Sequence, residues 1–133
     1  MKTDRLKYAE NILVTGGAGF IGGCFIRRLL NTSKKNIFNI DKCSYASDLN
    51  TIKQFEKNPR YKLLKVDLSN KDKLKEVFKD INPDLIVHFA AESHVDRSVE
   101  SPNLFIESNV IGTFNLLELS LNYWQNLKED KKK

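Results

Sequence analysis

Residues 15–22 read TGGAGFIG, a glycine-rich turn that decides the fold of this 133-residue chain. The turn holds two overlapping patterns, G-x-x-G-x-x-G at Gly16, Gly19 and Gly22, and G-x-G-x-x-G starting at Gly17. A short apolar run precedes it, and apolar residues at helical spacing follow it. A glycine turn between a strand and a helix lets the first N–H groups of the helix bind the phosphates of a dinucleotide. The stretch therefore predicts nucleotide binding, with a purely structural turn as the alternative.

Strand-like and helical patterns alternate along the rest of the chain. The strands are expected at residues 11–15, 36–41, 61–68 and 85–90, and the helices at 19–31, 48–57, 70–81 and 102–122. This rhythm predicts an α/β fold, a Rossmann-type parallel sheet with flanking helices, strand order 3-2-1-4, and about four βα units. The predicted domain is 1–133, the N-terminal portion of a dinucleotide-binding domain. Its ends, 1–10 and 124–133, are polar and expected to be disordered.

Composition excludes several classes of protein. Apolar residues make up 41% of the chain and charged residues 29%, as in ordinary soluble domains. No apolar run approaches the roughly 18 residues of a membrane span, and the first ten residues lack a signal-peptide pattern. Cys24 and Cys43 have no CxxC spacing, which favours free thiols and a cytoplasmic location.

The net charge of +5 raises the alternative of a nucleic-acid-binding protein. The lysines are interspersed with acids, and no RNA-binding aromatic motif or zinc-finger spacing accompanies them. We therefore expect no nucleic acid, no membrane and no metal as partners.

Two carboxylates end predicted strands. Asp41 follows Gly22 by nineteen residues and is placed to accept hydrogen bonds from the adenosine ribose, which favours NAD over NADP. The neighbouring Lys42 keeps NADP open, and an exposed acid without a ligand is the alternative. Asp67 ends the third strand and is a candidate for the adenine amino group.

Residues 88–98 read HFAAESHVDRS and leave the carboxyl end of the fourth strand. Two alanines there allow a ligand to lie against the backbone, at the sheet edge where open α/β folds bind ligands. His88 lies within the apolar strand and is expected to be a core histidine. Asp96 and Arg97 are expected to make only a surface or loop-bracing contact.

These motifs, with DKCSYASDLN at 41–50 and FIESNVIGTFNLLE at 105–118, resemble dTDP-glucose 4,6-dehydratases. Those enzymes belong to the extended short-chain dehydrogenases/reductases, and the resemblance runs from about residue 11 to 123. It implies an NAD site, with Ser93 also touching the sugar nucleotide. The cofactor-binding residues that it implies are Gly16, Gly19, Phe20, Ile21, Gly22, Asp41, Lys42, Cys43, Ser44, Asp67, Leu68, Phe89, Ala90, Ala91, Glu92, Ser93 and Ser108.

The chain departs from the family at three positions and lacks its catalytic elements. Gly23 and Ser108 replace a common serine and threonine, and Ser47 replaces a usual glycine. No Thr-Asp-Glu segment occurs. Tyr61 and Lys65 match the spacing of the family's Tyr-x-x-x-Lys pair, but on a strand they would lie about 13 Å apart. We therefore expect no catalytic residue in these residues, and a chain that stops before the family's fifth strand.

The resemblance implies the NAD-binding part of a homodimeric lyase that converts dTDP-glucose to dTDP-4-keto-6-deoxyglucose, inactive as this chain alone. A non-catalytic NAD-binding module, part of another nucleotide-sugar epimerase or dehydratase, and a degenerate product without activity are the alternatives.

Overall fold

The computed structural model describes residues 5–45 and 47–129. They form two compact units. The first, here called the sheet unit, consists of residues 5–45, 47–66 and 81–91; the second, the helical unit, consists of residues 67–80 and 92–129.

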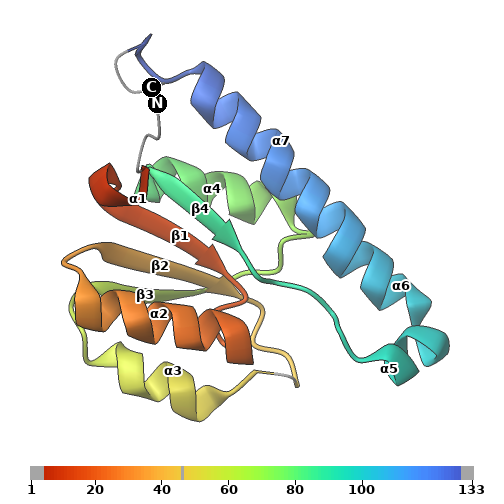
Figure 1. Cartoon of the computed structure of the whole chain (residues 1–133). Coiled ribbons are helices and arrows are strands. Elements are labelled where there is room, and N and C mark those ends of the chain that lie inside the picture. The colour runs from red at the N-terminus through yellow and green to blue at the C-terminus, as the bar shows by residue number, and fades with distance from the viewer. Residues whose placement is uncertain (1–4, 46, 130–133) are drawn as a thin grey trace. The chain divides into compact units, whose positions relative to one another are not determined.

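The sheet unit is built on four parallel strands, β1 (Asn11–Thr15), β2 (Asn36–Asp41), β3 (Tyr61–Lys65) and β4 (Leu85–His88). Their order across the sheet is β3-β2-β1-β4, which confirms the predicted order (Figure 1). β1 lies between β2 and β4, and its last residue, Thr15, pairs with Ile40 on one side and His88 on the other. The carboxyl ends of the strands therefore lie along one edge of the sheet.

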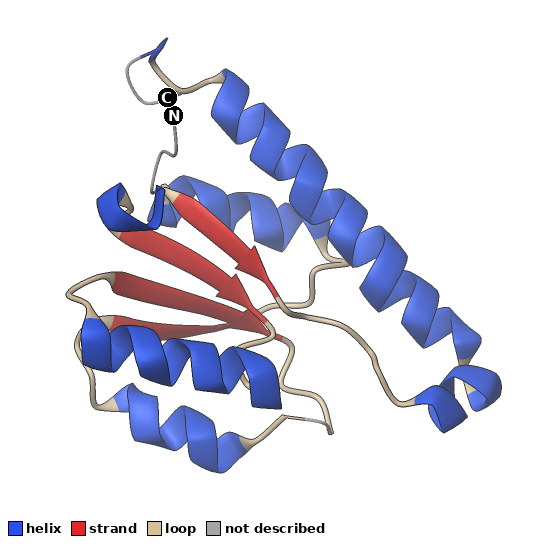
Figure 2. Cartoon of the chain, in the orientation of Figure 1, coloured by secondary structure: helices blue, strands red, loops and turns tan. Residues whose placement is uncertain are grey.

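Helices α2 (Phe20–Thr32) and α3 (Leu49–Glu56) lie along one face of this sheet (Figure 2). The apolar side chains between helices and sheet form one buried cluster, Ala9, Ile12, Val14, Ile26, Leu29, Leu30, Ile37, Phe55 and Tyr61. Burying one aliphatic side chain of this size contributes about 1.5–3 kcal/mol. This core fixes the position of β1 and α2, and with them the turn that joins the two.

Polar side chains stabilise one terminus of each helix, the N-terminus of α3 and the C-terminus of α2. Asp48 is the N-cap of α3 and accepts the backbone N–H groups of Asn50 at 2.9 Å and Thr51 at 3.2 Å. The guanidinium of Arg60 donates to the carbonyls of Leu30 at 2.7 Å and Ser33 at 2.6 Å. These carbonyls at the C-terminus of α2 would otherwise lack partners.

A short helix, α1 (Arg5–Tyr8), lies within the N-terminal segment that was expected to be disordered. The ammonium of Lys35 donates to the carbonyls of Lys7 at 3.2 Å and Ala9 at 2.5 Å, and Ala9 is buried. Residues 1–4 and 130–133, which belong to the two ends expected to be disordered, lie outside the described residues.

The helical unit holds α4 (Lys71–Ile81, its last residue in the sheet unit), α5 (Val95–Glu100), α6 (Pro102–Phe105), the π-helix η1 (Ile106–Ile111) and α7 (Gly112–Gln125). α4 and α7 pack together through an ion pair of 2.5 Å between Lys71 and Glu118 and an edge-on contact between the rings of Phe78 and Tyr123.

Three elements differ from the sequence-based expectation. The third strand ends at Lys65, because Asp67 accepts the N–H and hydroxyl of Ser69 in a tight turn. The helix expected at 102–122 is continuous in sequence but contains η1, and it extends to Gln125. The loop before Pro102 contains α5, which is too short to show a periodic pattern. In the described part of the chain, no helix is long and apolar enough to cross a membrane.

Candidate cofactor-binding site

The glycine-rich turn connects β1 to α2, as predicted. Gly16 adopts a φ of +71°, a conformation that L side chains rarely adopt. A Cβ at this position would lie 2.5 Å from the backbone nitrogen of Ala90. The turn closes with a hydrogen bond of 3.1 Å from Gly19 N–H to Gly16 O. Gly16 is therefore required by the chain itself, because the segment after β4 passes directly against it.

Asn39, in the middle of β2, fixes the glycine-rich turn through a side-chain hydrogen bond. Its side chain is fully buried, with Oδ1 accepting Gly17 N–H at 2.9 Å and Nδ2 donating to the Tyr61 hydroxyl at 2.9 Å. A Cβ on Gly17 would clash with this amide. Sequence reasoning missed Asn39, although a polar residue inside an otherwise apolar strand was a signal that could have found it.

The N-terminus of α2 is open. Gly19 is the N-cap and no side chain caps the helix, while Phe20 is 94% exposed and Ile21 is 66% exposed. A Cβ on Gly19 would meet only Gly16 O, at 3.3 Å, so the chain's own packing explains the glycine only in part. Unused N–H groups and the positive end of the helix dipole at such a place suit a phosphate. These residues fit the pyrophosphate of a dinucleotide.

Asp41, at the end of β2, lies beside the turn and is 8% exposed. Its Oδ2 accepts Ala18 N–H at 2.9 Å, and its Oδ1 accepts Cys43 N–H at 2.8 Å and the Ser47 hydroxyl at 3.2 Å. A carboxylate has about four acceptor positions, so these three bonds leave about one, on Oδ2. The expected pair of bonds to a ribose would thus require the Ser47 hydroxyl to turn away.

The other predicted residues after β2 follow Asp41 directly. Lys42, Cys43 and Ser44 are all half-buried, and Cys43 has a φ of +53°. Burial raises the pKa of the Cys43 thiol, and the nearby Asp41 carboxylate raises it further. Neither Cys43 nor the exposed Cys24 is in a disulfide.

The segment after β4 lies against the end of β1. Phe89 N–H donates to the Thr15 carbonyl at 3.0 Å, and Ala90 N–H donates to the Thr15 hydroxyl at 3.2 Å. The prediction of a core histidine was wrong, because His88 is exposed at the strand end. Its Nδ1 lies 2.5 Å from the Thr15 hydroxyl. The structure therefore brings Phe89 and Ala90 to the glycine-rich turn, and Ala91 follows them in the chain.

The remaining predicted residues belong to the helical unit. Asp67 is half-buried in its turn with Ser69, and Leu68 is buried against Gly112, with its carbonyl accepting Asn115 Nδ2 at 3.0 Å. These contacts give the predicted adenine-side residues a fixed local structure.

Asn109, which sequence reasoning missed, clamps Glu92. Its Oδ1 accepts Glu92 N–H at 2.8 Å and its Nδ2 donates to the Glu92 carbonyl at 2.9 Å. Ser108 precedes it in the π-helix η1, and Ser93 is exposed. Single π-helical turns occur often at functional sites.

Tyr61 is not placed as a catalytic tyrosine. Its ring is buried in the core and its hydroxyl accepts a hydrogen bond from Asn39. Burial raises the pKa of Tyr61, whereas a tyrosine that removes a proton needs a lowered one. Lys65 is exposed at the far end of the same strand, so Tyr61 and Lys65 do not lie on adjacent turns of a helix.

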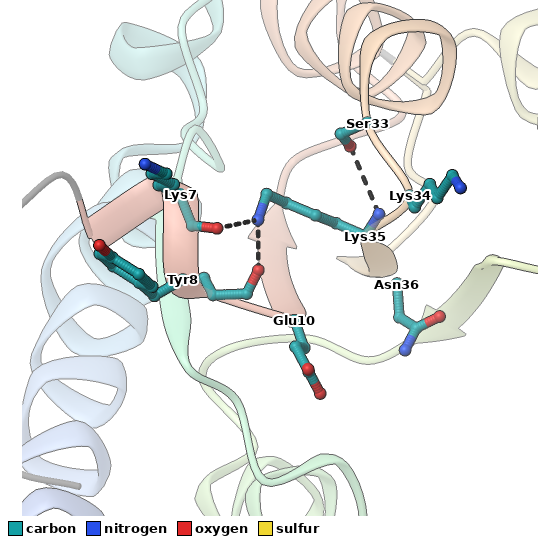
Figure 3. Close-up of a pocket in the computed structure, with 8 residues that line it drawn as sticks. Lys7, Tyr8, Glu10, Ser33, Lys34, Lys35 and Asn36 are labelled. Carbon is teal, nitrogen blue, oxygen red and sulfur yellow. Dashed lines mark hydrogen bonds between the residues drawn. The ribbon is translucent and has the colours of Figure 1, made fainter.

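A recess at the opposite, amino end of the strands is lined by residues of α1 and of the α2–β2 connection (Figure 3). The Lys35 side chain reaches into it and donates to two backbone carbonyls, those of Lys7 and Ala9. The chain therefore satisfies these carbonyls itself. Among the described residues, no three His, Cys, Asp or Glu side chains lie together as metal ligands would.

A family model described as GDP-mannose 4,6 dehydratase matches residues 13–132. The chain belongs to this family. The chain is also 45% identical over 122 residues to dTDP-glucose 4,6-dehydratase from Haemophilus influenzae, a match that covers 92% of this chain and 36% of that enzyme. The predicted resemblance to dTDP-glucose 4,6-dehydratases is therefore confirmed. The chain spans about a third of the length of the curated relatives that it matches.

Solved structures of a dehydratase and of an epimerase share the fold. The crystal structure of dTDP-glucose 4,6-dehydratase from Bacillus anthracis in complex with NAD is 40% identical, with a TM-score of 0.75 over 87% of this chain and 35% of that one. UDP-glucose 4-epimerase from Thermotoga maritima, solved with UDP-glucose, is 29% identical, with a TM-score of 0.75 over 85% of this chain and 34% of that one. The Rossmann-type architecture of this GDP-mannose 4,6 dehydratase family member is thus shared by dehydratases and epimerases.

Proposed function

We propose that this chain supplies the NAD-binding part of a dTDP-glucose 4,6-dehydratase that acts in the cytoplasm. The observation that carries the proposal is the open N-terminus of α2 beside a buried carboxylate: Gly19 has no side-chain cap, and Asp41 accepts Ala18 N–H in the same turn. The first offers N–H groups to a pyrophosphate, and the second offers an acceptor to a ribose and repels a 2′-phosphate. The 45% identity to the Haemophilus influenzae dehydratase supports the choice of enzyme.

Each predicted residue then has a stated role. Gly16, Gly19, Phe20, Ile21 and Gly22 form the pyrophosphate end. The ribose end consists of Asp41, Lys42, Cys43 and Ser44, and the adenine end of Asp67 and Leu68. Phe89, Ala90, Ala91, Glu92, Ser93 and Ser108 line the nicotinamide side, with Ser93 also meeting the nucleotide sugar.

When bound, NAD supplies the acceptor and donor of a hydride. The chain's own residues bind and orient it, and none of them is assigned a proton transfer. No Thr-Asp-Glu segment occurs in these 133 residues, and the one Tyr-x-x-x-Lys match, Tyr61 and Lys65, lies on strand β3. We therefore propose that this chain alone does not convert dTDP-glucose.

Calorimetric titration of the 133-residue chain with NAD, and in parallel with NADP, tests the proposal. Binding of NAD with a clear preference over NADP is expected, and the absence of NAD binding by the folded chain would contradict the proposed function. Incubation with dTDP-glucose and saturating NAD should give no product. If this chain alone made product, the assignment of no catalytic residue would be wrong.

We also propose that the full-length protein is a homodimer and that α7 contributes to the interface. The exposed apolar side chains of η1 and α7 recur every three or four residues: Ile106, Val110, Phe114, Leu117, Leu121 and Trp124. Residues 102–125 carry only two charges, Glu107 and Glu118, so little like-charge repulsion would oppose the docking of the same face of a second copy. Sedimentation should show a dimer that Leu117→Glu disrupts and Lys53→Glu, on α3, leaves intact; a monomeric full-length protein would exclude the proposal.

A further inference from the structure

The contacts of the Thr15 hydroxyl limit the directions that its hydrogen bonds can take. Thr15 is fully buried, and its Oγ1 lies 3.2 Å from Ala90 N and 2.5 Å from His88 Nδ1. The backbone N–H of Ala90 can only donate, so it uses an acceptor position of the hydroxyl oxygen. The hydroxyl proton then has one acceptor among these contacts, His88 Nδ1, and that nitrogen must be unprotonated.

The same contacts fix the state of the histidine. With Nδ1 accepting, the neutral imidazole carries its proton on Nε2. If Nδ1 carried the proton, the hydroxyl oxygen would accept from both Nδ1–H and Ala90 N–H, and the proton of the buried hydroxyl would have no acceptor among these contacts. Although His88 as a whole residue is exposed, partial burial of its imidazole lowers the pKa of His88, which agrees with a neutral side chain.

The chain of bonds ends at the cofactor-binding turn. Ala90 N–H is held by Thr15 on β1, and the backbone of Ala90 is the one that would meet a Cβ on Gly16 at 2.5 Å. Phe89 N–H is held by the Thr15 carbonyl at 3.0 Å. The orientation of the Phe89–Ala91 backbone relative to Gly16 therefore depends on a hydroxyl whose own orientation depends on His88.

We infer that His88 is a positioning residue for the cofactor site: as the Nε2–H tautomer it accepts the Thr15 hydroxyl and so locks the Phe89–Ala91 segment against the glycine-rich turn. The expected effect on NAD affinity rests on the proposed function, whereas the hydrogen bonds among His88, Thr15 and Ala90 are those of the chain without ligand. His88 touches neither cofactor nor substrate in it; the residue acts through Thr15 and the amide of Ala90.

The variants come in two matched pairs. Thr15→Val removes the hydroxyl at nearly constant volume, and Thr15→Ser restores it. His88→Leu removes the acceptor, and His88→Asn keeps one, because an asparagine Oδ1 occupies a position similar to that of Nδ1. Thr15→Val and His88→Leu should each weaken NAD binding about tenfold, the scale of one net hydrogen bond, and Thr15→Ser and His88→Asn should recover most of it.

The unliganded chain provides the deciding readouts. ¹⁵N spectra of its histidines should show His88 with an unprotonated Nδ1 and a protonated Nε2, and this preference should be lost in Thr15→Val. Exchange of the Ala90 amide should be faster in Thr15→Val and His88→Leu than in Thr15→Ser and His88→Asn. Observation of a protonated Nδ1 in the wild-type chain would overturn the inference even if the variants failed to fold.

The two proposals fail in different ways. A wild-type chain that binds no NAD but shows the Nε2–H tautomer and the Ala90 exchange pattern removes the proposed function and keeps the positioning role. If Thr15→Val and His88→Leu bind NAD as tightly as the wild-type chain does, and their Ala90 amides exchange at the wild-type rate, the positioning role is excluded and NAD binding is kept.

Discussion

Asp41 Oδ2 accepts the backbone N–H of Ala18 at 2.9 Å, so the carboxylate at the end of β2 is hydrogen-bonded to the middle of the glycine-rich turn. Sequence spacing predicted a carboxylate near the ribose of a bound nucleotide. The structure adds that the same carboxylate orders the turn and the residues after β2, through Cys43 and Ser47. Its replacement should thus affect both the unliganded site and the ligand.

Asp41→Ala should weaken NAD binding by about 1–3 kcal/mol, because hydrogen bonds to a charged group are lost from a buried position. Titration calorimetry measures the change. Asp84→Ala is the matched control: Asp84 also accepts two backbone N–H groups, those of Glu10 and Asn11, but at the amino end of the strands. An NAD affinity that falls equally in both variants would show that Asp41 acts only through the stability of the unit.

Gly19→Ala should mainly lower NAD affinity, whereas Gly16→Ala should mainly lower the stability of the fold. The added methyl at Gly19 meets only Gly16 O at 3.3 Å, so we expect a small change in melting temperature but a loss of NAD affinity of at least about tenfold. At Gly16 the positive φ and the 2.5 Å approach to Ala90 should cost about 2 kcal/mol or more of unfolding free energy. Undiminished NAD binding by Gly19→Ala would remove the pyrophosphate from this helix end.

Asn39→Leu should destabilise the sheet unit by about 2–4 kcal/mol, because it leaves Gly17 N–H and the Tyr61 hydroxyl buried without partners. Tyr61→Phe should cost less, about 1 kcal/mol, since it removes only the acceptor of one Asn39 N–H group. Urea unfolding of the two single variants and the double variant measures the coupling. Strictly additive effects would mean that the Asn39–Tyr61 bond contributes nothing beyond packing.

The N-cap of α3 predicts a pH dependence. The hydrogen bond from the Thr51 hydroxyl, followed by that from Thr51 N–H, holds the pKa of Asp48 below its usual value of 3.8. A carboxylate whose pKa is lower in the folded state stabilises the fold above its unfolded pKa, and the contribution disappears as the pH falls through the folded pKa. The midpoint of urea unfolding should therefore drop between about pH 5 and about pH 3.

Asp48→Asn is the control for that titration. It retains a capping oxygen and cannot ionise, so its unfolding midpoint should change less over the same pH range than that of the wild-type chain. Parallel curves for the two proteins would show that other carboxylates, and not Asp48, cause the acid response.

Sequence alone predicted the strand order and the position of the glycine-rich turn because both depend on local patterns: apolar runs bounded by turns, and glycines between a strand and a helix. The supporting side chains were not accessible in this way. Asn39 serves Gly17, twenty-two residues away in the sequence, and His88 serves Thr15, seventy-three residues away. Only the pairing of β1 with β2 and β4 brings these residues together, so their roles depend on tertiary structure.

The π-helix η1 is a second feature that the sequence pattern could not predict. Residues 102–122 have the apolar spacing of one regular helix. This spacing gives no sign that the helix widens to a π-helix at Ile106–Ile111. The wider turn accompanies the clamp between Asn109 and Glu92, a contact between segments seventeen residues apart.

The buried amide of Asn39 also bears on the thermodynamics of recognition. It joins Gly17 to Tyr61 in the chain without any ligand, so the shape of the glycine-rich turn is set by the protein interior. A ligand that meets an already formed turn loses little of its binding free energy to ordering the backbone. The turn is therefore preorganised. Substitutions of the core residues that support it should lower ligand affinity because they populate disordered forms of the unbound turn, although they remove no contact to the ligand.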